Sequence, residues 1–265
     1  MSENAALSDP TGTPCWYELT TTDPAAATAF YGAVLGWSVQ DSGMEGMTYL
    51  LASAPDGGMV AGMADSAEQE GDAPPGWLVY FATADCDASF ATATAAGAGV
   101  IVEPSDIPGT GRFAICTDPQ GAVFALLQPA PMAEPPASGA FNQEALGHGN
   151  WHELMTPDPQ AAFTFYADLL GWTKGQAMDM GEDGTYQLFA SGGTDIGGMM
   201  GLLGSPQAAW LPYFGVDSVT GASSRIADGG GTVVAGPHAV PGGAFIAVAQ
   251  DGQGAHFAVT GPESA

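Results

Sequence analysis

Two glutamates, one in each half of the chain, occur in the same aromatic context. Glu18 follows Trp16 by two residues, and Glu153 follows Trp151 by two residues. Side chains two positions apart in a strand share a face, so each carboxylate is expected beside an indole. Burying a carboxylate is costly unless a partner satisfies it. Three roles are therefore open: a hydrogen-bonded structural group, a partner for a cationic or donor group of a ligand, or a general acid or base whose pKa is raised by burial.

Two basic side chains are candidates to act with these carboxylates. His256 is expected to point into the cavity of the second half of the chain. There it could exchange protons with Glu153, because histidine titrates near neutral pH. Arg112 follows a Pro-Gly-Thr-Gly loop at the start of a predicted strand. It is expected either to clamp a ligand carboxylate or to pair with Asp106 or Asp118.

Aromatic side chains recur around both glutamates. Rings combined with a few polar groups are typical of a pocket for a flat or apolar organic molecule. The residues expected to line such pockets are Trp16, Tyr49, Tyr80, Trp151, Tyr186, Trp210 and Tyr213. Strand alternation places Tyr17 and His152 on the opposite face, so these two are expected to serve packing or the contact between domains.

The elements that must position these groups occur twice. The motifs Trp16-Tyr-Glu18-Leu, Asp23-Pro24, Phe30-Tyr31 and Leu35-Gly36-Trp37 return as Trp151-His-Glu153-Leu, Asp158-Pro159, Phe165-Tyr166 and Leu170-Gly171-Trp172, always 135 residues later. A fixed long period indicates an internal duplication. The length of 265 residues also favours two domains, of roughly 110 to 130 residues each.

Each half is predicted to contain two βαβββ units, which makes the chain α+β. The first unit begins with a strand over 14–20, continues with a helix that has Asp23 as N-cap and Pro24 as first residue and ends at Gly36, and closes with three strands. Four such units form two tandem domains with concave mixed sheets. The predicted divisions are an extended or disordered N-terminus over 1–13, a first domain over 14–129, a linker over 130–148 rich in Pro, Ala and Gly, and a second domain over 149–262.

These motifs, with the turn Asp118-Pro119-Gln120-Gly121 and its second copy at Asp251, resemble those of the vicinal oxygen chelate superfamily. That superfamily contains glyoxalase I, bleomycin-resistance proteins and extradiol dioxygenases. The run from Ser105 to Phe113 is similar to the two-domain branch labelled as hydroxylases or low-molecular-weight antigens. The resemblance covers most of the chain and implies the fold, whereas the superfamily hosts many chemistries on this one scaffold.

The resemblance also implies where a divalent metal would bind, with ligands on the first, fourth, fifth and eighth strands of each domain. The matching positions are Trp16, 60–62, 77–79 and Ala125 in the first domain, and Trp151, 200–202, 210–212 and Ala258 in the second. None of them is His, Glu, Asp or Cys, although a divalent metal needs three or four N, O or S donors. We therefore expect no metal and no other cofactor. A displaced site built from Glu18, Glu153 or His256 is the alternative.

The charge balance restricts the partners. The formal net charge is -26, and the only lysines and arginines are Arg112, Lys174 and Arg225. With so few cations the chain is expected to bind neither nucleic acid nor anionic lipid, while a cationic small ligand would be attracted. Three cysteines without CxxC spacing argue against a disulfide framework. No apolar run is long enough for a membrane span, and no signal peptide is recognised, so a cytoplasmic monomer or homodimer is expected.

Two functions remain from this reasoning. The first is metal-independent binding of an aromatic or cationic metabolite or antibiotic, of the sequestration or resistance type. The second is a tailoring enzyme, such as a lyase, isomerase or hydroxylase-like protein, in which Glu153 and His256 transfer protons and Glu18 has the corresponding place in the first half. A metal-dependent glyoxalase or dioxygenase is disfavoured because the expected ligands are missing.

Overall fold

The computed structural model describes residues 11–44, 46–68, 74–131 and 139–264, and the outermost N-terminus and the middle of the predicted linker lie outside these ranges. The elements of the first half are β1 (Pro14–Thr21), α1 (Pro24–Leu35), β2 (Ser38–Asp41), β3 (Tyr49–Ser53), β4 (Met59–Asp65), η1 (Ser66–Glu68), β5 (Gly76–Ala82), α2 (Cys86–Ala95), β6 (Gly99–Ile107), β7 (Gly111–Thr117) and β8 (Val123–Pro129). Those of the second half are β9 (Gly149–Met155), α3 (Pro159–Leu170), β10 (Thr173–Asp179), η2 (Gly181–Asp183), β11 (Thr185–Ser191), β12 (Thr194–Met200), β13 (Ala209–Gly215), α4 (Val219–Asp228), β14 (Thr232–Ala239), β15 (Phe245–Gln250) and β16 (His256–Gly261).

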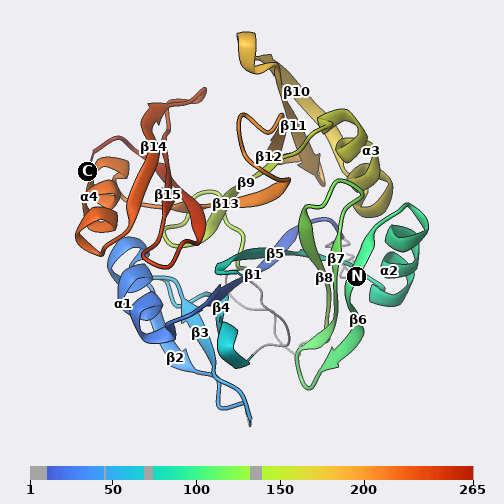
Figure 1. Cartoon of the computed structure of the whole chain (residues 1–265), viewed down its shortest axis with the longest axis horizontal. Coiled ribbons are helices and arrows are strands. Elements are labelled where there is room, and N and C mark those ends of the chain that lie inside the picture. The colour runs from blue at the N-terminus through green and yellow to red at the C-terminus, as the bar shows by residue number, and fades with distance from the viewer. Residues whose placement is uncertain (1–10, 45, 69–73, 132–138, 265) are drawn as a thin grey trace, which may run out of the picture.

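Each half forms one mixed sheet of eight strands, which confirms the predicted α+β class with four βαβββ units. The strand orders are β2-β3-β4-β1-β5-β8-β7-β6 and β10-β11-β12-β9-β13-β16-β15-β14. In each sheet the first strands of its two units pair antiparallel at the centre, β1 with β5 and β9 with β13. Both sheets are bent into a U, and the two U shapes lie back to back and open toward opposite ends of the molecule (Figure 1).

The first helix of each half begins and ends as the sequence predicts. Asp23 accepts a hydrogen bond from the backbone nitrogen of Ala26 at 3.0 Å, and Asp158 caps α3 in the same way. Such caps satisfy backbone donors that the first helical turn leaves without partners. Gly36 and Gly171 follow the two helices with φ values of 74° and 71°. This left-handed conformation favours glycine.

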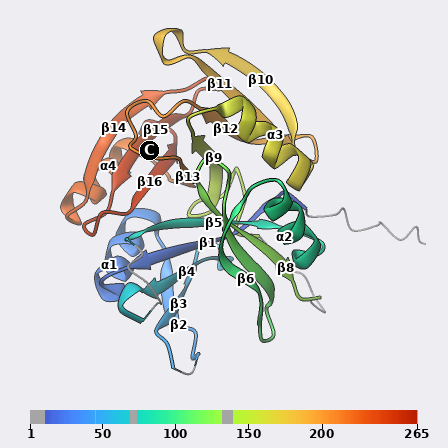
Figure 2. The same cartoon turned by 45° about the vertical axis from the view of Figure 1, so that its right-hand side comes forward.

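The two halves pack through their helix-bearing faces. Helix α1 lies beside α4, and α2 lies beside α3 (Figures 1 and 2). Between the sheets lies an aromatic core. The ring of Phe214 is 5.2 Å from those of Trp37 and Trp77, and the ring of Phe81 is 5.1 Å from that of Trp172. Because each group mixes rings from both halves, the core belongs to both domains.

Reciprocal hydrogen bonds cross this interface and use the repeated motifs. Trp77 donates through its indole nitrogen to the hydroxyl of Tyr31 at 3.0 Å, and that hydroxyl donates to Asp251 of the other half at 3.0 Å. The second copy of this arrangement runs from Trp210 through Tyr166 to Asp118, with distances of 3.0 and 3.2 Å. The Phe-Tyr motif and the Asp-containing turn therefore serve the contact between domains.

Each Asp-containing turn also reaches the first helix of the opposite half through its glutamine. Gln253 accepts hydrogen bonds from the backbone nitrogens of Thr22 and Asp23 at 2.9 and 2.8 Å. Gln120 accepts one from the backbone nitrogen of Asp158 at 2.6 Å and donates to its carbonyl at 2.9 Å. Among the described residues, no helix combines the length and apolar character needed to cross a membrane.

Candidate functional site

Strand register brings the two glutamates and their aromatic neighbours together on the faces opposite the helices. In the first sheet Glu18 lies between Gly62 of β4 and Leu78 of β5, and Trp16 lies opposite Tyr80. The second sheet repeats this arrangement, with Glu153 between Gly198 and Leu211 and with Trp151 opposite Tyr213. We call Trp16, Glu18, Tyr49 and Tyr80 the first tetrad, and Trp151, Glu153, Tyr186 and Tyr213 the second tetrad.

A chain of hydrogen bonds connects the members of the first tetrad. The indole nitrogen of Trp16 donates to the hydroxyl of Tyr49 at 3.2 Å, and this hydroxyl donates to Oε2 of Glu18 at 3.0 Å. Tyr80 also hydrogen-bonds to the Glu18 carboxylate. The carboxylate therefore receives two phenolic donors.

The second tetrad contains the same four residue types in equivalent places. Trp151 donates to the Tyr186 hydroxyl at 2.9 Å, and the Tyr213 hydroxyl donates to Oε2 of Glu153 at 3.2 Å. Tyr186 also hydrogen-bonds to Glu153. The six aromatic residues and two glutamates predicted from the sequence thus form two equivalent clusters, one in each half.

A glycine on the neighbouring strand makes room for one tyrosine of each tetrad. A β-carbon added to Gly62 would lie 1.9 Å from the Tyr49 hydroxyl oxygen, and one added to Gly198 would lie 2.2 Å from the Tyr186 ring. Sequence reasoning missed this role. It assigned the implied ligand position on the fourth strand of the second domain to residues 200–202. In the structure the residue of that strand that pairs with Glu153 is Gly198, which lies closer to the N-terminus. The two adjacent glycines before Met199 were the feature of the sequence from which this close approach could have been predicted.

The environment of each glutamate disfavours its charged form. Burial raises the pKa of Glu18 and of Glu153, and the tyrosine hydrogen bonds partly offset that shift. None of the three lysine and arginine side chains of the protein balances the charge of Glu18 or Glu153. Arg112 pairs with Asp87 and Asp106, Lys174 donates to Gln160, and Arg225 pairs with Asp217.

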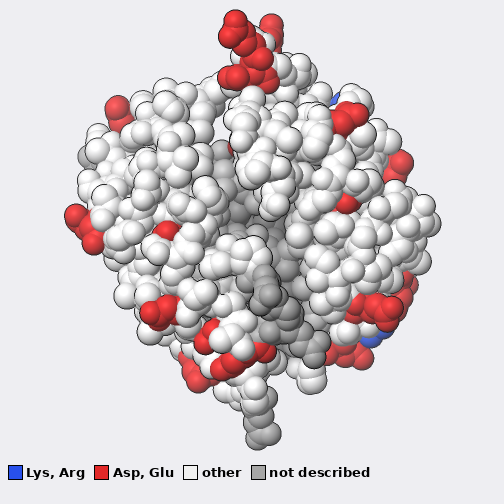
Figure 3. Space-filling model, viewed as in Figure 1, with Lys and Arg blue, Asp and Glu red and all other residues white. Residues whose placement is uncertain are grey.

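The faces that carry the tetrads are partly open to solvent. In Figure 3 the surface is hollowed between the arms of the upper sheet, and acidic side chains lie mostly around the periphery. Trp151 and Glu153 are only partly buried, as are Trp16, Glu18 and Tyr49 of the first tetrad. The clusters are therefore partly accessible from solvent and are not sealed in the core.

Three residues predicted for the site lie elsewhere. Trp210 is buried in the interdomain core, where it donates to Tyr166. On β13 it belongs to the face opposite that of Leu211 and Tyr213, because neighbouring strand residues alternate. The prediction that it lines the pocket is corrected accordingly.

His256 and Arg112 also differ from their predicted places. His256 begins β16, is exposed, and lies 3.2 Å from the side-chain nitrogen of Gln250. Strand β13 separates it from the strand of Glu153, and in the described chain no hydrogen bond joins the two. Arg112 forms an ion pair with Asp106, one of its predicted partners, and with Asp87 of α2. It therefore lies on the helix side of the sheet and not among the first tetrad.

The donor set does not fit the metal that the resemblance implies. The positions facing one another around Glu18 are Trp16, Gly62, Tyr80 and Ala125. Indole, methyl and absent side chains supply no metal ligands. Burial raises the pKa of Tyr80, so its phenol stays protonated, and the one carboxylate is engaged by two hydroxyls. Within the described ranges no group of three or more His, Cys, Asp and Glu side chains is arranged to hold a metal ion.

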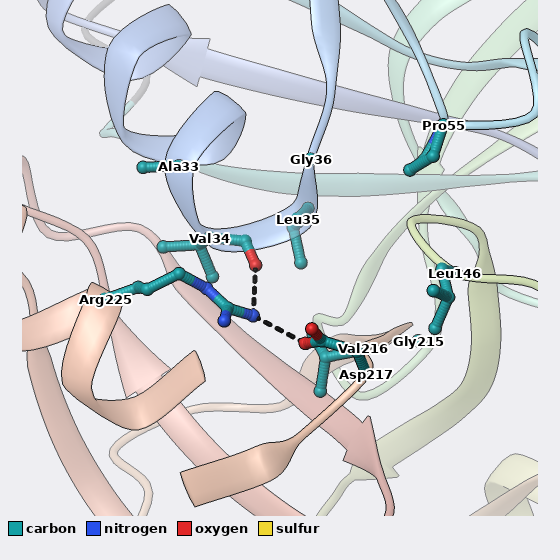
Figure 4. Close-up of a pocket in the computed structure, with 10 residues that line it drawn as sticks. All are labelled: Ala33, Val34, Leu35, Gly36, Pro55, Leu146, Gly215, Val216, Asp217 and Arg225. Carbon is teal, nitrogen blue, oxygen red and sulfur yellow. Dashed lines mark hydrogen bonds and ion pairs between the residues drawn. The ribbon is translucent and has the colours of Figure 1, made fainter. Parts of the chain in front are cut away.

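A separate cavity of about 270 Å³ lies between the domains (Figure 4). Val34 and Leu35 at the end of α1 form one side, and Arg225 of α4 with Asp217 forms the other. The guanidinium of Arg225 donates to the Val34 carbonyl at 3.3 Å and to Asp217 at 2.9 Å. A cation at the C-terminal end of a helix is favourable, so this arginine stabilises the contact between the halves.

Comparisons with known proteins agree with this architecture. The family model described as the glyoxalase/bleomycin resistance protein/dioxygenase superfamily matches residues 15–126 and 146–259. The anthracycline biosynthesis protein DnrV of Streptomyces peucetius is 33% identical over 251 residues, covering 88% of this chain and 87% of the relative. CFP32, a candidate glyoxylase of Mycobacterium tuberculosis, is 47% identical over 130 residues, a match that spans only 48% of either protein.

Among solved structures, the fold is similar to that of a Mn(II)-bound glyoxalase from Novosphingobium aromaticivorans. The TM-score is 0.63 at 19% identity, and the match covers 97% of this chain and 83% of that one. At this identity the likeness concerns the fold alone.

Proposed function

The chain belongs to the glyoxalase/bleomycin resistance protein/dioxygenase superfamily, and we propose that it binds an aromatic or cationic small molecule without a metal ion. The observation that supports this most strongly is the tetrad in each sheet. In both halves an indole stands at the first position where the resemblance implies a metal ligand, and two phenols and a carboxylate lie beside it. Rings around a few convergent polar groups are typical of sites for organic ligands.

The relatives are consistent with an aromatic ligand. DnrV and the similar DauV of Streptomyces sp. are named for anthracycline biosynthesis, and an anthracycline contains fused flat rings. This chain matches both of them over most of its length, at 33% and 32% identity. A flat ring system would contact the indoles of Trp16 and Trp151. Such binding lowers the concentration of the free molecule, which is the sequestration or resistance role.

Metal analysis and ligand titration test this proposal together. Purified protein is expected to contain no stoichiometric transition metal, and chelation is expected to leave ligand binding unchanged. Aromatic probes are expected to alter tryptophan fluorescence, and Trp16→Leu and Trp151→Leu should each remove one binding event. Val234→Ala, at an exposed position on an edge strand, is the control. Stoichiometric metal that is needed for binding, or unchanged binding in the double tryptophan variant, would contradict the proposal.

Proton-transfer catalysis is the second candidate, because burial raises the pKa of Glu153. A carboxyl group with a raised pKa is suited to act as a general acid or base. The partner expected from the sequence, His256, hydrogen-bonds instead to Gln250, so the phenols of Tyr186 and Tyr213 are the groups that would assist. Turnover that is lost in Glu153→Gln while binding persists would establish catalysis. Stoichiometric recovery of unchanged ligand would favour binding alone.

A further inference from the structure

We infer that each tetrad recognises an organic ammonium group, so that one chain binds two ligands that carry a protonated or quaternary amine on an apolar or aromatic body. This inference rests on the proposed function and specifies the class of ligand. Its first support is the unbalanced charge of the two sites. Glu18 and Glu153 are partly buried, and the three cationic side chains of the protein are paired elsewhere. The balancing charge at each carboxylate must come from a proton or from a ligand.

The direction of the hydrogen bonds leaves the carboxyl group as an acceptor that a cationic donor can also reach. The indole nitrogen of Trp16 can only donate, so the Tyr49 oxygen accepts from it and directs its own proton to Glu18. The carboxylate is the acceptor at the end of this chain. Trp151, Tyr186 and Glu153 repeat the arrangement. Both tetrads thus present a carboxyl oxygen as the acceptor, and an ammonium group beside it would stabilise the ionised form that burial alone disfavours.

Each carboxylate retains capacity for a further donor. An ionised carboxylate offers about four acceptor sites, and two tyrosine hydroxyls occupy part of that capacity at Glu18 and at Glu153. An ammonium group would supply both the missing donor and the missing positive charge.

The rings of the tetrads supply the second attraction. Trp16 and Tyr49 meet through a hydrogen bond at their edges, and in the described chain no stacking or edge-to-face contact joins two rings of one tetrad. The faces of indole and phenol rings attract cations, and aromatic cages are a known arrangement for the recognition of quaternary ammonium groups. The acidic surface would further concentrate cations near the protein.

Repetition within the chain also supports a common ligand group. The halves differ at two pairs of matching positions, with Arg112 in place of Phe245 and Val123 in place of His256. The four residue types of the tetrad are nevertheless the same in both halves. The sites therefore share the ammonium-binding group and differ in what surrounds the rest of the ligand.

Matched probes test this inference on the full chain. Choline and 3,3-dimethylbutan-1-ol have nearly the same shape but differ in charge, and benzyltrimethylammonium adds an aromatic body to the cation. Calorimetry is expected to show two benzyltrimethylammonium ions per chain and an affinity for choline at least about tenfold above that for the alcohol. The double variant Glu18→Gln/Glu153→Gln should lose this preference, while each single variant should keep one site. Glu103→Gln, which removes an exposed carboxylate, should change nothing.

The outcomes separate this inference from the proposed function. If neutral aromatic probes bind at the tetrads and the cations bind no better, the ammonium inference is overturned and the proposed function stands. Failure of both cations to bind overturns the inference as well. If the tryptophan substitutions change the binding of no organic probe, charged or neutral, the proposed function fails. Circular dichroism and thermal unfolding of the glutamine variants establish that they are folded.

Discussion

The hydroxyl of Tyr17 lies 2.7 Å from Nε2 of His152, and the two rings are stacked across the domain interface with an interplanar angle of 3°. The other ring nitrogen of His152 lies 3.0 Å from the carbonyl oxygen of Ile196. That oxygen can only accept, so Nδ1 carries the proton and Nε2 accepts from Tyr17. In the sequence, each residue of the pair lies between the tryptophan and the glutamate of one tetrad. One buried hydrogen bond therefore connects the strands that bear the two sites.

Acid should destabilise the protein through His152. Burial lowers the pKa of His152 from 6.5 to about 4. A depressed histidine pKa contributes stability that is present above the unfolded pKa and lost as the pH falls through the folded pKa. The free energy of unfolding should fall by about 3 kcal/mol from this group between those two pH values. Urea unfolding across this range measures it, and the paired variant Tyr17→Phe/His152→Phe should show a correspondingly smaller decrease. An equally steep decrease in that variant would contradict the prediction.

The glutamates of the tetrads should act in the opposite direction. Burial raises the pKa of Glu18 and Glu153 above the ordinary value. The stability from these groups is fully present below the unfolded pKa and is lost as the pH rises through the folded pKa. Glutamine keeps the shape without ionising, so the double glutamine variant should be at least as stable as the natural protein at pH 8. Thermal unfolding at pH 4 and pH 8 tests this, with Glu103→Gln as control. A variant that is less stable only at pH 8 would show that the prediction is wrong.

The glycines beside the tetrads should not tolerate a methyl group. Gly62→Ala and Gly198→Ala would push aside the rings of Tyr49 and Tyr186. Each should cost about 1–3 kcal/mol of unfolding free energy, because displacing the ring breaks a buried hydrogen bond, and each should weaken ligand binding in its own half. Gly201→Ala is a matched control because no atom lies within 4 Å of the added carbon. Chemical denaturation and ligand titration together provide the measurement.

Removing an interdomain tyrosine hydroxyl should lower the unfolding free energy more than removing a buried hydroxyl with an uncharged partner. In Tyr31→Phe, Asp251 loses a partner that lies 3.0 Å away, and a buried carboxylate with one donor fewer costs about 1–3 kcal/mol. Asp251→Asn in the Tyr31→Phe background should recover part of this loss, since the amide carries no charge. A double-mutant cycle from urea unfolding gives the coupling energy. Additive effects of the two substitutions would indicate that the contact carries no energy of its own.

The duplicated motifs were enough to predict most of the fold. Helix α1 begins after Asp23 and ends at Gly36 as expected, because capping residues act locally. Alternation correctly placed Tyr17 and His152 on the face turned away from the tetrads. These features depend on neighbours within a few residues, and a single sequence contains that information.

Most errors in the site arose where several strands must be aligned, but the one at Trp210 did not. Trp210 and Tyr213 lie three positions apart on β13 and so face opposite sides, which the alternation itself could have revealed. His256 required knowledge of where β16 begins relative to the rim of the sheet. The role of Gly198 required the register of β12 against β9, and a shift of one residue would turn every side chain to the other face.

The contacts from Tyr31 to Asp251 and from Tyr166 to Asp118 are reciprocal, as in a symmetric homodimer, where each subunit gives what it receives. A single ancestral copy of the repeat could have formed both contacts with a second copy of itself. The present chain has the geometry of such a dimer fused into one polypeptide. In a fused chain the two copies can differ at matching positions, as Arg112 in one half and Phe245 in the other do.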